Sequence, residues 1–181
     1  MTHHDEVHSK TILGFWIYLL TDFMMFGALF ATYAVLVKGP LGRDLFSLPF
    51  TLIQTLILLV SSFTFGLSER VLKGKWVLWG VTFFLGVLFL GMEWRELSEL
   101  VRKGFDWEKN AFLSIFFTLL GTHALHVIFG LLWMLVFLIP VGRFGFNEIS
   151  ERRLTCLRMF WQFVNVVWVF IFSIVYLLGV A

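Results

Sequence analysis

Long apolar runs, separated by short polar stretches, follow one another along the whole chain. A helix that crosses a membrane needs about 20 predominantly apolar residues, because each residue advances it by about 1.5 Å. Five runs are long enough, at residues 14–37, 50–67, 76–94, 111–139 and 157–180, and Pro140 is expected to end the fourth. The pattern predicts an all-α fold, an integral membrane bundle of five transmembrane helices, with residues 1–181 forming a single membrane domain.

The composition supports a membrane protein and excludes several other classes. Of the 181 residues, 59% are hydrophobic and 14% are charged, and the mean hydropathy is +0.88. A soluble domain of this length needs a more polar exterior. The net charge of +2 gives no indication of a nucleic-acid partner. The one cysteine, Cys156, excludes an intrachain disulfide and a cysteine-cluster metal site, and its apolar neighbours are typical of an inert side chain.

The distribution of Lys and Arg between the two sides predicts an orientation. The stretches on the side of the N-terminus carry eight of these residues and those on the opposite side carry six. Cytoplasmic loops are enriched in Lys and Arg. The bias favours a cytoplasmic N-terminus and a C-terminus on the outer side.

Small residues and tryptophans give the runs two further features. Glycines inside a span allow close approach of helices, and tryptophans near the ends of spans are typical of an aromatic belt at the membrane surface. The glycines are Gly27, Gly86, Gly91, Gly121 and Gly130, and the tryptophans are Trp16, Trp76, Trp79, Trp94, Trp107 and Trp161.

Three ionisable residues fall deep inside the runs. Asp22 is expected roughly 18 Å from the outer face, and His123 and His126 roughly 18 and 22 Å from it, so all three share about the same depth. A carboxylate in hydrocarbon needs a partner or a proton. We therefore expect Asp22 to meet a histidine, a hydroxyl such as that of Thr21 or Thr122, or a lipid head group.

The spacing of the two histidines limits what they can bind. Positions 123 and 126 lie on one face of a helix, whereas the axial ligands of a bis-histidine haem lie on opposite sides of the ring. A copper or zinc site needs further ligands, and only Asp22 or Glu93 is available. From this spacing we predict no bis-histidine haem and no metal site in this chain.

The remaining polar residues of interest lie near the ends of the third and fifth runs. For Glu96 and Glu99 the pattern indicates a charged helix end in water, whereas Glu93 could be either a functional contact or part of that end. Gln162 and Asn165 are expected to form hydrogen bonds between helices. The residues predicted to make intramembrane polar or lipid contacts are Asp22, Glu93, His123, His126, Trp161, Gln162 and Asn165.

Several motifs occur together in a characteristic order. They are GFWIYLLTD, GPLGRDLFSLPF, GMEWREL, GTHALHV and FWQFVNVVWVF, which are spread over nearly the whole chain. In these motifs the chain resembles subunit III of the haem–copper respiratory oxidases. More narrowly, it is similar to the five-span subunit III of the cytochrome bo-type ubiquinol oxidases.

The resemblance implies a non-catalytic subunit of a proton-pumping complex in the bacterial cytoplasmic membrane, with its C-terminus in the periplasm. Subunit I, its direct partner, would carry the haems and copper and reduce oxygen, and subunits II and IV would complete the complex. Subunit III is linked with bound phospholipid, complex stability and proton uptake. The acidic residues of the family match Asp22 and Glu93, and its His-x-x-His matches His123 and His126.

The chain departs from the family pattern at three positions. The family usually has His and Asp where this chain has Gln162 and Asn165, and bo-type relatives often have Glu where it has Gln54. Amides keep the hydrogen bonding of these groups and lose their titration. The departures favour a packing role for these positions here.

Other functions remain open from the sequence. Within the oxidase interpretation, similarity favours quinol as the electron donor, and a cytochrome c-linked oxidase is the alternative. A small membrane transporter or proton channel that uses Asp22 and the histidines is an alternative of another class. Transporters often have inverted repeats and helices broken by Pro or Gly. The sequence shows no evident repeat and no proline inside a span. The histidine spacing disfavours a b-type cytochrome.

Overall fold

The chain is almost entirely helical in the computed structural model, which describes residues 3–37, 48–68, 75–105, 111–144 and 148–177. Its elements are α1 (His3–Leu36), α2 (Leu48–Leu67), α3 (Lys75–Arg102), α4 (Ala111–Phe144), α5 (Glu148–Ile171) and a π-helical segment, η1 (Phe172–Leu177). Within these described ranges, five helices are long and apolar enough to cross a membrane. The predicted all-α, five-span fold is confirmed. Trp107, which was expected in the aromatic belt, lies outside the described residues.

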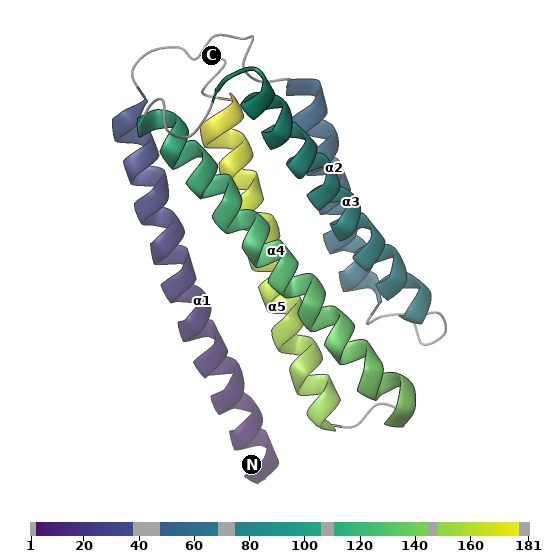
Figure 1. The fold of residues 1–181 in the computed structure, drawn as a ribbon. Coiled ribbons are helices and arrows are strands. Elements are labelled where there is room, and N and C mark those ends of the chain that lie inside the picture. The colour runs from purple at the N-terminus through teal and green to yellow at the C-terminus, as the bar shows by residue number, and fades with distance from the viewer. Residues whose placement is uncertain (1–2, 38–47, 69–74, 106–110, 145–147, 178–181) are drawn as a thin grey trace.

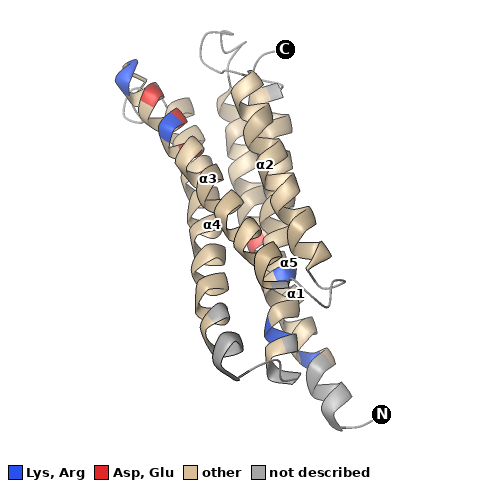
Figure 2. Cartoon of the chain, turned by 90° about the vertical axis from the view of Figure 1, so that its right-hand side faces the viewer, with Lys and Arg blue, Asp and Glu red and all other residues tan. Residues whose placement is uncertain are grey.

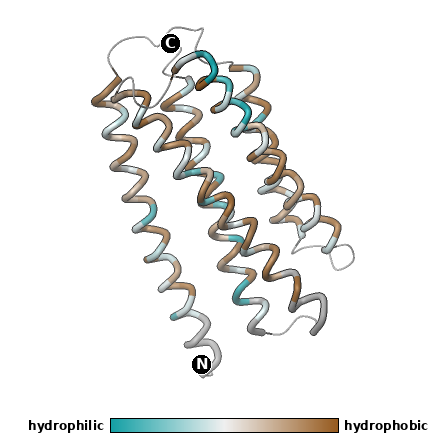
Figure 3. Tube along the Cα trace, in the orientation of Figure 1, coloured by the Kyte–Doolittle hydropathy of each residue, from teal (hydrophilic) through white to brown (hydrophobic). Residues whose placement is uncertain are grey.

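The helices form two layers (Figures 1 and 2). One layer contains α1, α5 and α2, with α5 in the middle, and the other contains α4 and α3. Helices α2 and α3 pack closely as an antiparallel pair, while α1 packs on α4 and α5 at the opposite side of the molecule. Hydrophobic residues follow most of each helix, and the more hydrophilic ones gather towards helix ends and at a few inner positions (Figure 3).

Two helices continue beyond the ends that the sequence predicted. Helix α3 runs to Arg102, eight residues past the predicted end at residue 94, because its buried face continues through Glu96 and Leu100. Helix α4 passes Pro140 and ends at Phe144. A proline removes one backbone donor, and helices in membrane proteins tolerate this where other groups compensate. Pro140 therefore does not end the helix.

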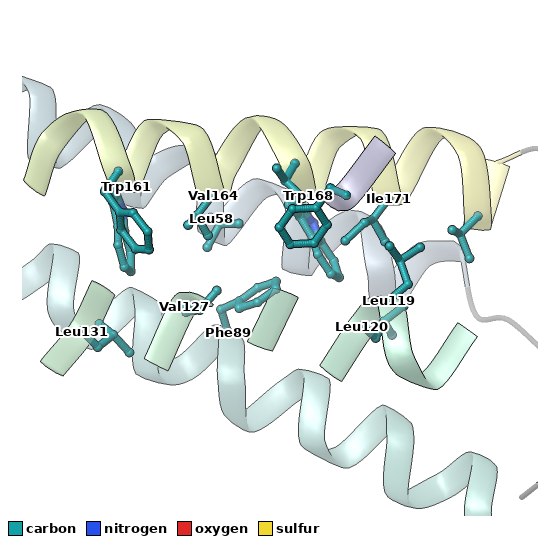
Figure 4. Packing of buried hydrophobic residues seen from close by; sticks show 14 of the residues in the cluster. Leu58, Phe89, Leu119, Leu120, Val127, Leu131, Trp161, Val164, Trp168 and Ile171 are labelled. Atoms are coloured by element: carbon teal, nitrogen blue, oxygen red, sulfur yellow. The ribbon is translucent and has the colours of Figure 1, made fainter. Parts of the chain in front are cut away.

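Leu131 and Trp161 lie in the core between α3, α4 and α5 (Figure 4), and two glycines make room for them. A Cβ at Gly86 would lie 2.8 Å from Leu131 and 2.9 Å from the Trp161 ring, and one at Gly130 would lie 3.0 Å from that ring. Close helix approach is thus confirmed at these two positions. At Gly27, Gly91 and Gly121 a Cβ would meet nothing within 4 Å.

Three buried tryptophans attach α2 and its C-terminal end to the neighbouring helices through their indole N–H groups. Each donates to a hydroxyl oxygen: Trp79 to Ser68 at 2.9 Å, Trp161 to Ser61 at 3.3 Å and Trp168 to Thr55 at 3.1 Å. Trp79 and Trp161 were expected in the aromatic belt, but both are buried in the core. A large ring whose polar group has a partner is as well suited to a core as to a membrane surface. Trp16, Trp76 and Trp94 are exposed, as a belt requires.

Candidate functional site

The first histidine of α4, His123, turns towards α3 and α5. Its Nδ1 lies 3.9 Å from Glu93 Oε1, and its Nε2 lies 3.2 Å from the carbonyl oxygen of Val164. Because a carbonyl only accepts, Nε2 carries the hydrogen of that bond. At 3.9 Å the approach of Nδ1 to Oε1 is longer than a hydrogen bond and is a close charge-pairing contact between α4 and α3. Both side chains are buried, with exposed fractions of 0% and 1%.

The second histidine, His126, turns towards α1. Its Nε2 lies 3.6 Å from Asp22 Oδ2, and its Nδ1 donates to the carbonyl oxygen of Thr122 at 2.7 Å on its own helix. The Tyr18 hydroxyl, one turn along α1, also faces the Asp22 carboxylate. The ring is held between Phe26 and Phe160. This pair is partly accessible, with exposed fractions of 16% for His126 and 15% for Asp22.

The two histidines therefore do not share a partner. Asp22 lies beside His126, and a histidine was one of the partners expected from the depth of Asp22. His123, which the same depth estimate placed near Asp22, lies against Glu93 instead. The Thr21 hydroxyl bonds to a carbonyl of its own helix and does not serve Asp22. Residues three apart on a helix differ by about 60° around its axis, which is enough to direct these rings to different neighbours.

Glu93 belongs to a buried polar cluster that the sequence revealed only in part. Glu96, one turn further along α3, was expected at a hydrated helix end, but it is buried with an exposed fraction of 7%. Its carboxyl faces the Tyr176 hydroxyl and the Gln54 amide. Glu96 is buried because α3 is longer than predicted and carries this residue into the space between α2 and η1. The three-residue spacing from Glu93 to Glu96 was a signal of this shared face, whereas no local signal marked Tyr176.

The polar residues of α5 face opposite sides of that helix. Trp161 is buried and donates to Ser61 of α2. Asn165 is also buried, and its Nδ2 donates to the Trp161 carbonyl oxygen at 2.7 Å, within its own helix rather than between helices. Gln162 is exposed on the outer face of α5, and its side-chain amide makes no hydrogen bond to another described residue. Within the described residues, neither Gln162 nor Asn165 forms the side-chain hydrogen bond between helices that the sequence predicted.

A basic pocket opens near the N-terminal ends of α1 and α5. Arg152 and Arg153 line it together with Thr11, Tyr18 and Trp133, and Cys156 contributes to its wall. These residues lie at the beginning of the α1 and α5 spans and near the end of the α4 span. The pocket therefore lies at one end of the membrane spans, and Tyr18 links it to the Asp22–His126 pair one turn further along α1.

The described part of the chain contains no group of three or more His, Cys, Asp and Glu side chains placed to hold a metal ion. The Glu93–His123 and Asp22–His126 pairs instead use their histidine nitrogens for contacts with a carboxylate and a main-chain carbonyl. The arrangement can hold protons between helices and neutralise buried charge.

Comparison with known proteins places the whole chain beside one family. A family model described as cytochrome c oxidase subunit III matches residues 1–180. The chain is similar to the cytochrome bo(3) ubiquinol oxidase subunit 3 of Pseudomonas aeruginosa, with 47% identity over 97% of this chain and 90% of that protein. The protein of the same name from Buchnera aphidicola is 42% identical over 96% of this chain and 94% of its own length. The cytochrome c oxidase subunit 3 of a Bacillus species is 41% identical over 94% of this chain and 87% of that protein.

Proposed function

This chain belongs to the cytochrome c oxidase subunit III family, and we propose that the haem–copper terminal oxidase it serves oxidises quinol. The chain is a multi-pass protein of the bacterial inner membrane, and its partners are other subunits of the oxidase. The observation that supports quinol is the set of relatives named cytochrome bo(3) ubiquinol oxidase subunit 3, which are 47%, 44% and 42% identical over nearly the full chain. The alternative donor is cytochrome c, which the name of the Bacillus relative carries.

Within that complex we propose that the chain holds no redox centre and supports the subunit that does. It would pack directly against subunit I, which carries the haems and copper, in an assembly with subunits II and IV. The histidine contacts support this role. Each of these two histidines lies within 4 Å of a carboxylate and contacts a main-chain carbonyl, and these contacts join α4 to α3, α5 and α1. Such links give the bundle a fixed shape against which a partner can pack.

We further propose that the chain binds phospholipid and supports proton uptake at one end of the bundle. The basic pocket supports the first part, because Arg152 and Arg153 suit a lipid phosphate and the Trp133 ring suits the start of an acyl chain. The partly exposed Asp22–His126 pair supports the second part, since it can accept a proton and lies next to that pocket. A cytoplasmic N-terminus would place both features on the side from which protons are taken up.

Purification through this chain tests the proposal. An affinity tag on the chain should recover a haem–copper subunit from mild detergent, and the recovered complex should consume oxygen with ubiquinol and not with reduced cytochrome c. Recovery of the complex with activity on cytochrome c alone would replace quinol with the alternative donor. Recovery of the chain without any haem-containing subunit would overturn the subunit role itself.

A further inference from the structure

Three side chains of the buried polar cluster have hydrogen-bonding atoms without a partner in the described part of the chain. They are Gln54 of α2 and Glu93 and Glu96 of α3, with exposed fractions of 0%, 1% and 7%. Neither atom of the Gln54 amide makes a hydrogen bond there, and neither do the two carboxyl oxygens of Glu93 or Oε2 of Glu96. Buried polar atoms are almost always paired, so these groups need a partner that the surrounding side chains do not supply.

The three side chains face one site rather than scattered positions. The Gln54 amide and the Tyr176 hydroxyl both face the Glu96 carboxyl. Glu93 lies one turn from Glu96 on the same face of α3, and both carboxyls are neighbours of the Tyr176 hydroxyl. The atoms that need a partner therefore gather where α2, α3 and η1 meet.

Aromatic rings enclose this site. Phe89, Phe116 and Trp168 are buried, with exposed fractions of 0%, 1% and 0%. The Trp168 centroid lies 4.6 Å from that of Phe89 (Figure 4) and 6.4 Å from that of Tyr176, and the Phe116 centroid lies 6.3 Å from that of Tyr176. Neither a lipid head group nor a side chain of another protein reaches polar groups enclosed in this way. Their partner is a molecule small enough to be buried with them.

The chemistry of the atoms distinguishes water from a cation. The carboxyl and amide oxygens accept hydrogen bonds, whereas Gln54 Nε2 only donates. A cation serves the oxygens alone, while a buried water molecule both donates and accepts and typically makes about three hydrogen bonds. The part of the chain that the structure describes also has no group of three or more His, Cys, Asp and Glu side chains placed to hold a metal ion. Water therefore matches the whole set of atoms.

We propose that the buried polar cluster is an internal water site, in which ordered water bridges the Gln54 amide to the carboxyls of Glu93 and Glu96 and so links α2 to α3. The site lies near the end of the bundle at which α2 begins and α3 ends. Gln54 is six residues after Leu48, and Glu96 is six residues before Arg102, which is about 9 Å along each helix axis. Water enters from this end, opposite the N-terminal end of α1 (Figure 1).

X-ray radiolytic labelling of the full chain, in the complex recovered through it, tests for the water. Irradiation splits water into hydroxyl radicals, which inside a protein oxidise side chains next to a bound water. Mass spectrometry then measures the oxidation rate of Tyr176 in the site and of Met134 in the apolar core, both with an exposed fraction of 0%. We expect Tyr176 to be oxidised several times faster, although methionine is the more reactive side chain. Equally slow oxidation of the two would overturn the proposal.

Substitutions connect the water to the cluster. Glu96→Leu should lower the oxidation rate of Tyr176 to that of Met134, because it removes the carboxyl at the centre of the site. Glu96→Gln keeps the polar atoms and should retain most of the rate. Glu99→Leu, at an exposed position of the same helix, is the control and should leave the rate unchanged. An unchanged rate in Glu96→Leu would count against the site, and the wild-type comparison decides the question if that variant does not fold.

A density map of the complex at a resolution that shows water is an independent test. We expect density within hydrogen-bonding distance of both the Gln54 amide and the Glu96 carboxyl. A direct hydrogen bond between these two groups, with no density beside them, would refute the water site. A dry site would leave the subunit role intact. If no haem–copper subunit is recovered, the subunit role is wrong, and the same labelling of the purified chain still decides whether the site holds water.

Discussion

Two carboxylate–histidine pairs occupy neighbouring turns of α4 at similar depth, yet their surroundings differ. Glu93 and His123 have exposed fractions of 1% and 0%, while Asp22 and His126 have 15% and 16%. His123 also reaches a carbonyl of α5, so the first pair joins three helices, whereas the remaining nitrogen of His126 bonds within α4. The Glu93–His123 pair, called the inner pair below, is thus a buried link between helices. The Asp22–His126 pair, called the outer pair, is partly accessible.

The difference indicates separate roles for the two pairs. Breaking a buried pair leaves an uncompensated charge or an unsatisfied polar atom, so the inner pair should matter most for stability. The outer pair lies next to the basic pocket and is accessible to water or lipid. Its loss should therefore matter more for how long the oxidase stays active during turnover. The following variants test this division, in order of decreasing expected effect on the free energy of unfolding.

Glu93→Leu should have the largest effect. It removes the buried carboxyl that lies 3.9 Å from His123 Nδ1, and we expect the free energy of unfolding to fall by about 3 kcal/mol. Denaturant titration of the purified chain in detergent measures this. The control is Glu99→Leu on the exposed face of the same helix, which should change stability by less than about 0.5 kcal/mol. Adding His123→Leu to Glu93→Leu should recover part of the loss, and equal losses in the Glu93 and Glu99 variants would contradict the role of the inner pair.

Gly86→Ala should come next. Its Cβ would press on Leu131 and Trp161, and overpacking of this kind costs about 1–3 kcal/mol. Because Gly86 lies two turns from Glu93 on the same face of α3, hydrogen exchange should rise in α3 and α4 and stay unchanged in α1. Gly91→Ala is the matched control, since nothing lies within 4 Å of its Cβ position. A faster exchange in α1 as well would mean that the two pairs are not separable.

Trp168→Phe should have a smaller effect of about 1 kcal/mol. It removes the indole donor to Thr55 while keeping an aromatic ring beside His123, whose centroid lies 5.1 Å from that of Trp168. Thermal unfolding of the variant measures the loss. Trp94→Phe on the exposed surface should leave the unfolding temperature unchanged, and a comparable decrease there would remove the distinction between core and belt tryptophans.

Asp22→Asn should have the smallest effect on stability, about 1 kcal/mol or less, because its pair is partly exposed and screened. Its effect should be seen in the complex. We expect oxygen consumption to begin at a rate near that of the wild type, to decline faster during turnover, and to be accompanied by reduced lipid retention. Time courses of oxygen consumption and phosphate analysis of the purified complex measure these. Thr21→Val is the control, and unchanged durability and lipid content in Asp22→Asn would refute the role of the outer pair.

The candidate site was predictable in its residue types and only partly in its contacts. Asp22, Glu93, His123 and His126 stand out in the sequence because ionisable groups are costly in hydrocarbon. The sequence did not predict which carboxylate each histidine meets. Residues three apart, such as His123 and His126, lie on one broad face of a helix, but their side chains point about 60° apart around its axis. Glu96 was misassigned to water for a related reason, because its burial depends on Gln54 and Tyr176, which are distant in the chain.

The sequence by itself determined the number of membrane spans and the family, because span length and apolar composition are local properties fixed by the thickness of a bilayer. The spacing of His123 and His126 also predicted, from helix geometry alone, that the two do not act together as the axial ligands of one haem. Only the tertiary structure decided which carboxylate each histidine meets, that Trp161 fills the core, and that Gln162 faces outward. Those facts depend on how the helices are placed around one another, and side-chain packing between segments far apart in sequence sets that placement.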